Sequence, residues 1–186
     1  RLEPLGYVSG ISGKWHLEVT TNPNATSRRD RFIKHRDLLP HAQGFDEYFV
    51  GVMQDYTASH GLDGTPFPDA PRDIREEGCR VVLQTEAALG FLKRREKNPD
   101  QPWLLYLSYM APHTPLESPE PWFSKTPENL PMIRRQGLAL IGAIDDGVGR
   151  IRKQLRAMDQ EENTLIFFLG DNGAPLAPED PNAARN

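Results

Sequence analysis

One short stretch near the end of the sequence constrains the fold most. Residues 164–169 form a nearly continuous apolar run of β-branched and aromatic side chains, and the run stops at Gly170-Asp171-Asn172-Gly173. Such a run predicts a strand that is buried on both faces of a parallel sheet. A carboxylate and an amide at the carboxyl end of such a strand are typical of sites in open α/β sheets.

Two interpretations of Asp171 and Asn172 fit this stretch. Carboxylate and amide oxygens are hard ligands, and they suit Ca²⁺ or Mg²⁺. Asp-Asn-Gly is also turn chemistry, because Asp and Asn bond to nearby backbone and tolerate left-handed conformations. The stretch alone therefore leaves a metal site and a simple turn both open.

Length, charge and cysteine content exclude several classes of protein. The 186 residues suffice for one domain with a hydrophobic core. The 22 Lys and Arg residues nearly balance the 26 Asp and Glu residues, so the charge predicts no nucleic-acid partner. No apolar run approaches the roughly 20 residues that a membrane span needs. Cys79 is the only cysteine, which excludes an internal disulfide and a cysteine-rich metal site.

Two further predicted strands also end in chemically useful side chains. Residues 6–11 predict a short strand that runs directly into a segment with Lys14 and His16. These two side chains point the same way in an extended chain, and together they suit an anion such as sulfate or phosphate. Residues 103–109 predict a second buried strand, followed by His113 in a stiff loop between two prolines. A solvated lysine and packed or loop histidines are the alternatives.

The order of the predicted elements indicates the fold class. Helical spacing of apolar residues predicts helices over 73–97 and 133–158, and the segments 18–36 and 52–72 are predicted to be loops. Strands that alternate with helices predict an α/β fold with a mostly parallel sheet and helices on its faces. The carboxyl ends of parallel strands share one edge. That edge is expected to hold Lys14, His16, His113, Asp171 and Asn172.

Five motifs carry a resemblance to a known family, in the family's order and over nearly the whole chain. They are Gly6-Tyr7-x-Ser9-x-x-Ser12-Gly13-Lys14-Trp15-His16, Gly44-Phe45-Asp46-Glu47-Tyr48-Phe49, Ala111-Pro112-His113-Thr114-Pro115, Ile144-Asp145-Asp146-x-x-Gly149 and Gly170-Asp171-Asn172-Gly173. The chain resembles the type I, formylglycine-dependent sulfatases of the alkaline-phosphatase-like superfamily. Among these it resembles arylsulfatases and N-acetylgalactosamine-6-sulfatases.

The resemblance implies an alkaline-phosphatase-like fold and a sulfuric ester hydrolase. It implies that Asp171 and Asn172 are two ligands of a Ca²⁺ ion, with Mg²⁺ as the other candidate. Lys14 would contact the sulfate and the nucleophile, and His16 would act as a base on the hydrated aldehyde nucleophile. His113 would bind sulfate and help to protonate the leaving oxygen. The implied partner is a sulfated small molecule or glycan, and the implied location is secreted, periplasmic or lysosomal.

The chain departs from the family pattern at the nucleophile. The family's Cys/Ser-x-Pro-x-Arg string, whose first residue is oxidised to formylglycine, does not occur, and the early Asp pair of the metal site is also absent. Asp145 and Asp146 do not replace that pair, because adjacent helical positions diverge by about 100°. We therefore expect residues 1–186 to be the central part of a sulfatase catalytic domain, with both flanks missing and no turnover by this fragment alone.

Two other functions remain open at this point. A phosphodiesterase or phosphonate hydrolase of the same superfamily uses the same metal and anion groups on a different ester. A catalytically silent relative that only binds sulfated glycans would keep the anion-binding residues without the nucleophile.

Overall fold

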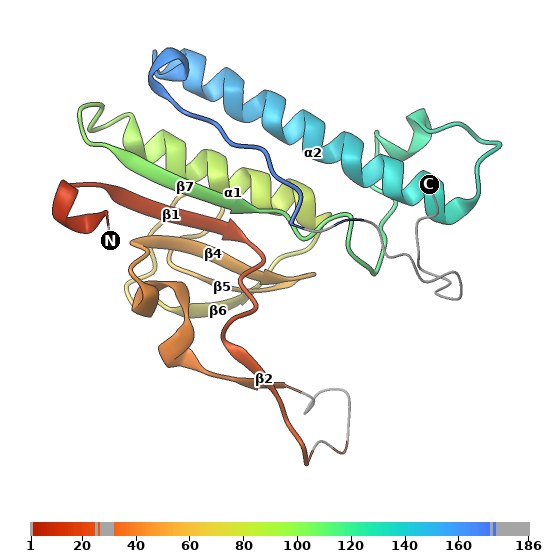
Figure 1. Cartoon of the computed structure of the whole chain (residues 1–186), viewed down its shortest axis with the longest axis horizontal. Coiled ribbons are helices and arrows are strands. Elements are labelled where there is room, and N and C mark those ends of the chain that lie inside the picture. Colours follow the sequence, from red (N-terminus) through yellow and green to blue (C-terminus); the bar gives the residue numbers. More distant parts are fainter. Residues whose placement is uncertain (1, 25, 27–31, 172, 174–186) are drawn as a thin grey trace. The chain divides into compact units, whose positions relative to one another are not determined.

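The computed structural model describes residues 2–24, 26, 32–171 and 173 (Figure 1). The chain divides into two compact units. The sheet unit comprises Arg1–Gly78 and Leu83–Tyr109, and the loop–helix unit comprises Cys79–Val82 and Met110–Asn186. The predicted site residues are divided between them, because Lys14 and His16 belong to the sheet unit and the others to the loop–helix unit.

The sheet unit is built on a five-stranded mixed sheet with the strand order β6-β5-β4-β1-β7 (Figure 1). β1 pairs in parallel with β4 and β7, whereas β5 pairs antiparallel with β4 and β6. Every strand except β5 therefore runs in one direction, which confirms the predicted α/β fold with a mostly parallel sheet. The strands are β1 (Val8–Gly13), β4 (Glu47–Val52), β5 (Asp55–Ala58), β6 (Arg72–Arg75) and β7 (Trp103–Ser108).

One face of the sheet packs against α1 (Arg80–Arg95), and small residues in β1 make the close approach possible. A Cβ atom on Gly10 would lie 2.5 Å from Cδ2 of Phe91, so only glycine fits at that position. Two residues further along β1, the Ser12 hydroxyl donates to the carbonyl oxygen of Gln84 at 2.8 Å. The glycine- and serine-rich sequence of β1 thus sets the spacing between this strand and the helix.

The opposite face of the sheet carries a second apolar cluster. Ile11, Tyr48 and Val50 are buried there, and Trp15 and Phe45 pack against them. Side chains of β1 alternate between the two faces, as the pleat of a strand requires. Two short 3₁₀ helices, η2 (Arg36–Leu38) and η3 (Pro40–Gln43), precede Phe45 in the chain.

Segments 18–36 and 52–72 are more structured than the loops that the sequence predicts. Val19–Thr21 (β2) and Phe32–Lys34 (β3) form a two-stranded antiparallel sheet, and 52–72 contains β5. A further 3₁₀ helix, η1 (Glu3–Leu5), precedes β1. Strands this short have little pattern of their own, so their pairing depends on neighbours that are distant in sequence.

The loop–helix unit contains the longest helix, α2 (Met132–Ala157), which confirms the helix predicted over 133–158. Its buried side consists of Ala139, Leu140, Ala143, Gly147 and Leu155. The 3₁₀ helix η4 (Phe123–Lys125) lies before α2, and η5 (Glu161–Asn163) lies after it. No helix among the described residues is long and apolar enough to cross a membrane.

α1 confirms the helix predicted over 73–97 except at its start, whereas the strand predicted over 164–169 is wrong. The predicted helix over 73–97 begins only at Arg80, because Ile74 pairs with Tyr56 in the sheet and Gly78 has a φ of +131°. Residues 164–169 are not a strand, and the side chains of 165–169 are between 49% and 83% exposed. A strand needs a neighbouring strand for its N–H and C=O groups, and no described strand pairs with this run.

Candidate functional site

Lys14 lies where β1 leaves the sheet, beside the end of β7. Its backbone N–H donates to the carbonyl oxygen of Ser108 at 2.7 Å, so the bond continues the pairing of the two strands for one residue. Because β1 and β7 are parallel, both of their carboxyl ends lie at this edge. The structure therefore places Lys14 at the carboxyl edge of the sheet, where open α/β folds bind ligands.

Trp15 anchors the loop that holds Lys14 and His16. Its ring meets Phe45 edge-on, with the ring centroids 5.9 Å apart, and its Nε1–H donates to the carbonyl oxygen of Leu38 at 2.8 Å. His16 is exposed and has a φ of +59°, in the left-handed region. The extended geometry assumed for Lys14 and His16 therefore ends at Trp15, and their spacing in sequence does not make their side chains parallel.

Gly13, the last residue of β1, lies against the backbone of β7, and we expect its substitution to destabilise the fold. Its φ is +113°, and an added Cβ atom would lie 2.0 Å from the carbonyl oxygen of Ser108. We expect Gly13→Ala to lower the free energy of unfolding by about 1–3 kcal/mol, as for other strained backbone positions. Urea denaturation would measure this loss. Gly6→Ala is the matched control, because Gly6 also has a positive φ but no neighbouring atom within 4 Å. Equal losses in both variants would contradict the steric argument.

His113 lies in the loop–helix unit, in an exposed loop shaped by local hydrogen bonds. Its backbone N–H donates to the carbonyl oxygen of Met110 at 3.0 Å. Its ring Nδ1 lies 2.7 Å from the carbonyl oxygen of Thr114. A carbonyl oxygen only accepts, so Nδ1 carries a proton, and Nε2 is the nitrogen that can meet a substrate.

A residue that the sequence analysis missed holds this loop from inside the same unit. Arg80 is fully buried, and its Nη2 donates to the carbonyl oxygens of His113 and Pro115, the latter at 2.8 Å. Its Nε lies 3.1 Å from Oε2 of Glu117 in an ion pair. No local pattern in the sequence could have identified Arg80, because an arginine in the first turn of a helix usually points to solvent.

The predicted metal ligands do not form a site within the described residues. Asp171 is exposed and follows the exposed run 165–169, and Asn172 lies outside the described residues. Across the parts of the chain that the structure describes, no three His, Cys, Asp or Glu side chains gather closely enough to hold a metal ion. The described residues therefore do not by themselves form the metal centre that the resemblance implies.

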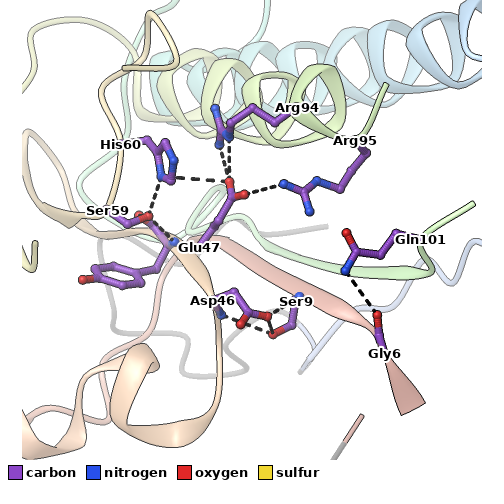
Figure 2. Close-up of polar contacts among 10 residues, drawn as sticks. Gly6, Ser9, Asp46, Glu47, Ser59, His60, Arg94, Arg95 and Gln101 are labelled. Atoms are coloured by element: carbon purple, nitrogen blue, oxygen red, sulfur yellow. Dashed lines mark hydrogen bonds and ion pairs between the residues drawn. The ribbon is translucent and has the colours of Figure 1, made fainter. Parts of the chain in front are cut away.

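A separate charged cluster lies at the amino end of β4 (Figure 2). Glu47 is nearly buried, and its carboxylate accepts from Arg94 Nε and from Arg95 Nη2, both at 2.7 Å. His60 Nδ1 lies 4.0 Å from Glu47 Oε2 and 2.9 Å from the Ser59 hydroxyl oxygen. Ligand sites in such sheets lie at carboxyl ends, and here two arginines already occupy the carboxylate oxygens, so we interpret this cluster as structural.

The His60 imidazole makes the stability of the fold depend on pH. Burial lowers its pKa most, and the positive charge of Arg94 lowers it further, against the opposing effect of Glu47. The unfolded chain, with a histidine pKa of about 6.5, therefore binds more protons than the folded chain between the two values. The stability contributed by neutral His60 is fully present above the pKa of the unfolded chain. It is lost as the pH falls through the lower pKa of the folded chain.

We therefore expect the urea concentration at the unfolding midpoint to decrease when the pH is lowered from 7.5 to 5.5. The decrease should be smaller in His60→Gln. His41→Gln is the control, because His41 is an exposed histidine of the same unit, with its ring tilted beside that of Tyr48. An unchanged pH dependence in His60→Gln would show that other groups cause the effect.

Asp46 is the residue of the Gly44–Phe49 motif that joins two strands of the sheet. One of its carboxylate oxygens, Oδ2, accepts from the backbone N–H of Ser9 at 2.8 Å and from the Ser9 hydroxyl at 2.9 Å (Figure 2). The Asp46 backbone N–H donates in turn to the Ser9 carbonyl oxygen at 3.0 Å. These bonds join β1 to the residue just before β4, so this motif supports the sheet and does not contribute a reactive group.

The sequence model of the family described as Sulfatase matches residues 2–185. The uncharacterized sulfatase YdeN of Escherichia coli (strain K12) is 33% identical over 180 residues, covering 92% of this chain and 31% of YdeN. Human N-acetylgalactosamine-6-sulfatase is 29% identical over 200 residues, covering 96% of this chain and 33% of the human protein. The chain thus spans about a third of the length of these curated relatives.

Solved structures with a similar fold include two sugar complexes. The crystal structure of Ps i-CgsB in complex with k-i-k-neocarrahexaose has a TM-score of 0.65 and 24% identity, covering 88% of this chain and 37% of that chain. BT4656 in complex with its substrate D-glucosamine-2-N,6-O-disulfate has a TM-score of 0.58 and 16% identity, covering 88% of this chain and 47% of that chain. At these identities the likeness concerns the fold.

Proposed function

Because the chain belongs to the sulfatase family, we propose that the protein containing it hydrolyses sulfate esters. The observation that supports this most is the backbone bond from Lys14 to Ser108, which holds a lysine at the carboxyl ends of two adjacent parallel strands. Ligands of open α/β sheets bind outside such ends. A lysine ammonium there suits the anionic group of a sulfate ester.

Lys14, His16 and His113 carry the proposed chemistry. A bond forms from the nucleophile oxygen to sulfur as the bond between sulfur and the leaving oxygen breaks, and negative charge gathers on the leaving oxygen and on the other sulfate oxygens. The Lys14 ammonium stabilises this charge in the transition state. His113 binds sulfate and donates a proton from Nε2 to the leaving oxygen, while its Nδ1–H stays on Thr114. His16 accepts a proton from the nucleophile, which we assign to a formylglycine outside residues 1–186.

Asp171 and Asn172 belong to the proposal as two ligands of a divalent ion, Ca²⁺ in preference to Mg²⁺. The chemistry of their oxygens supports this assignment, because both ions prefer oxygen ligands. The remaining ligands would have to come from elsewhere in the protein, since the described residues offer no cluster of three. Calorimetry with CaCl₂ on the protein and on Asp171→Asn tests the assignment, and equal affinities would remove Asp171 from it.

The proposed substrate is a sulfated carbohydrate or aryl ester. Similarity to N-acetylgalactosamine-6-sulfatase and to an arylsulfatase of Hemicentrotus pulcherrimus supports this class. The proposed location is secreted, periplasmic or lysosomal. We also propose that residues 1–186 form the central part of the catalytic domain, which is why the fragment alone is not expected to turn over substrate.

Two assays test the proposed reaction against its alternatives. The protein that contains this chain is given 4-nitrophenyl sulfate and bis(4-nitrophenyl) phosphate, and release of nitrophenol is followed. Faster turnover of the sulfate supports the proposal, whereas faster turnover of the diester favours the phosphodiesterase alternative. Binding of sulfated oligosaccharide without turnover of either ester would identify a catalytically silent relative.

A further inference from the structure

The buried guanidinium of Arg80 holds the backbone on both sides of Thr114, the residue whose carbonyl oxygen faces the His113 imidazole. Its Nη2 donates to the carbonyl oxygens of His113 and Pro115, and both acceptors belong to the loop–helix unit, as Arg80 does. Thr114 stands between these two residues in the sequence, and its carbonyl oxygen accepts the imidazole Nδ1–H. One side chain therefore holds the residues before and after the carbonyl group that orients the imidazole.

We propose that Arg80 is a positioning residue for His113, an inference that rests on the proposed sulfate ester hydrolysis. A buried charge is costly unless it is paired and hydrogen-bonded. Arg80 has no exposed surface, and Glu117 supplies the opposing charge at 3.1 Å. Nη2 donates to both loop carbonyls while Nε faces Glu117, so two nitrogens of the planar guanidinium make contacts that the single ammonium of a lysine cannot reproduce.

The contacts of Arg80 determine the direction in which Nε2 of His113 points. The ring orientation of His113 follows from its Nδ1–H bond, so a shift of the Thr114 carbonyl swings Nε2 away from the leaving oxygen. Displacements of about 1 Å can cost about 10²-fold in rate. Arg80 itself touches no reacting atom, so its effect on turnover passes through His113.

A double-mutant cycle separates this role from a general structural one. Arg80→Lys, His113→Ala and the double variant are made in the protein that contains this chain, and kcat and KM for 4-nitrophenyl sulfate are measured. We expect Arg80→Lys to lower kcat about 10- to 100-fold with little change in KM. In the His113→Ala background the same substitution should lower kcat no further, because the residue that it positions is gone. Additive losses, or an unchanged kcat in Arg80→Lys, would overturn the proposal.

Arg135→Lys is the matched control. Arg135 also belongs to the loop–helix unit, where it donates to the Thr126 hydroxyl at 2.9 Å and stacks on Phe123. Neither of these two contacts involves the His113 loop. It should leave kcat unchanged. A loss equal to that of Arg80→Lys would show that an arginine of this unit matters without contacting the His113 loop, and would contradict the specific role.

Hydrogen exchange on the unsubstituted protein decides the question even if Arg80→Lys fails to fold. A clamped loop predicts slow exchange of the His113 amide, which donates to Met110. Exchange as fast as that of an unstructured peptide would overturn the clamp. If the unsubstituted protein hydrolyses no sulfate ester, the proposed function fails. If it does and the cycle is additive, only the Arg80 inference fails.

Discussion

Replacing Lys14 with alanine is expected to lower kcat/KM for an aryl sulfate by about 10²- to 10³-fold, the loss typical for one electrostatic group that stabilises a transition state. The substitution removes only the side chain, because the hydrogen bond to Ser108 comes from the backbone N–H of Lys14 and is kept in alanine. The Trp15 anchor beside it is also unchanged. The loss should therefore reflect the ammonium group and not the loop. Steady-state kinetics on 4-nitrophenyl sulfate would measure it.

Two comparisons make the Lys14 result interpretable. Lys153→Ala removes an exposed lysine of α2 and should leave kcat/KM within a factor of about two, since exposed substitutions are usually neutral. Inorganic sulfate should inhibit Lys14→Ala more weakly than the unsubstituted protein, because the same ammonium would bind it. Turnover of Lys14→Ala within about threefold of normal would remove Lys14 from the catalytic site.

Replacing Glu47 with glutamine is expected to lower the free energy of unfolding by about 3 kcal/mol, because it leaves buried cations without their partner. Arg94 and Arg95 both donate to this carboxylate, and the three side chains are only 12–21% exposed. The amide of glutamine keeps the shape but not the charge. Urea denaturation at neutral pH would measure the loss, and kcat of the folded protein should stay close to normal if the cluster is structural.

Glu161→Gln supplies the control for Glu47. Glu161 also accepts from two arginines, Arg152 and Arg156, but these are 56% and 52% exposed. Solvent weakens such pairs, so the expected loss is much smaller than that of Glu47→Gln. A loss in Glu47→Gln no larger than in Glu161→Gln would mean that water also screens Arg94 and Arg95.

Local sequence information was sufficient for several parts of this protein. The apolar stripe of α2 lies within one continuous segment, so its period predicted the helix to within one residue at each end. β1 and β7 were predicted from their composition, and Lys14 was predicted at a strand end, where the structure has it. The resemblance in the five motifs predicted the family, which the family comparison confirmed.

Other features depended on contacts between residues far apart in the chain. Residues 73–75 have a sequence compatible with a helix, but pairing with β5 makes them part of a strand. Residues 164–169 have the composition of a buried strand, but no described strand pairs with them, and a strand cannot satisfy its own backbone groups. In both cases the deciding hydrogen bonds involve partners that no local window contains.

The sequence alone thus accounts for the helix period and the parallel strands β1 and β7, and it is the source of the roles proposed for Lys14 and His113. These properties follow from residue type and from the intervals between residues, which are local. The tertiary structure alone decided the role of β6, the left-handed backbone of His16 and the contacts of Arg80 with the His113 loop. Arg80 and Pro115 are 35 residues apart, and only folding brings a guanidinium and a carbonyl together across that distance.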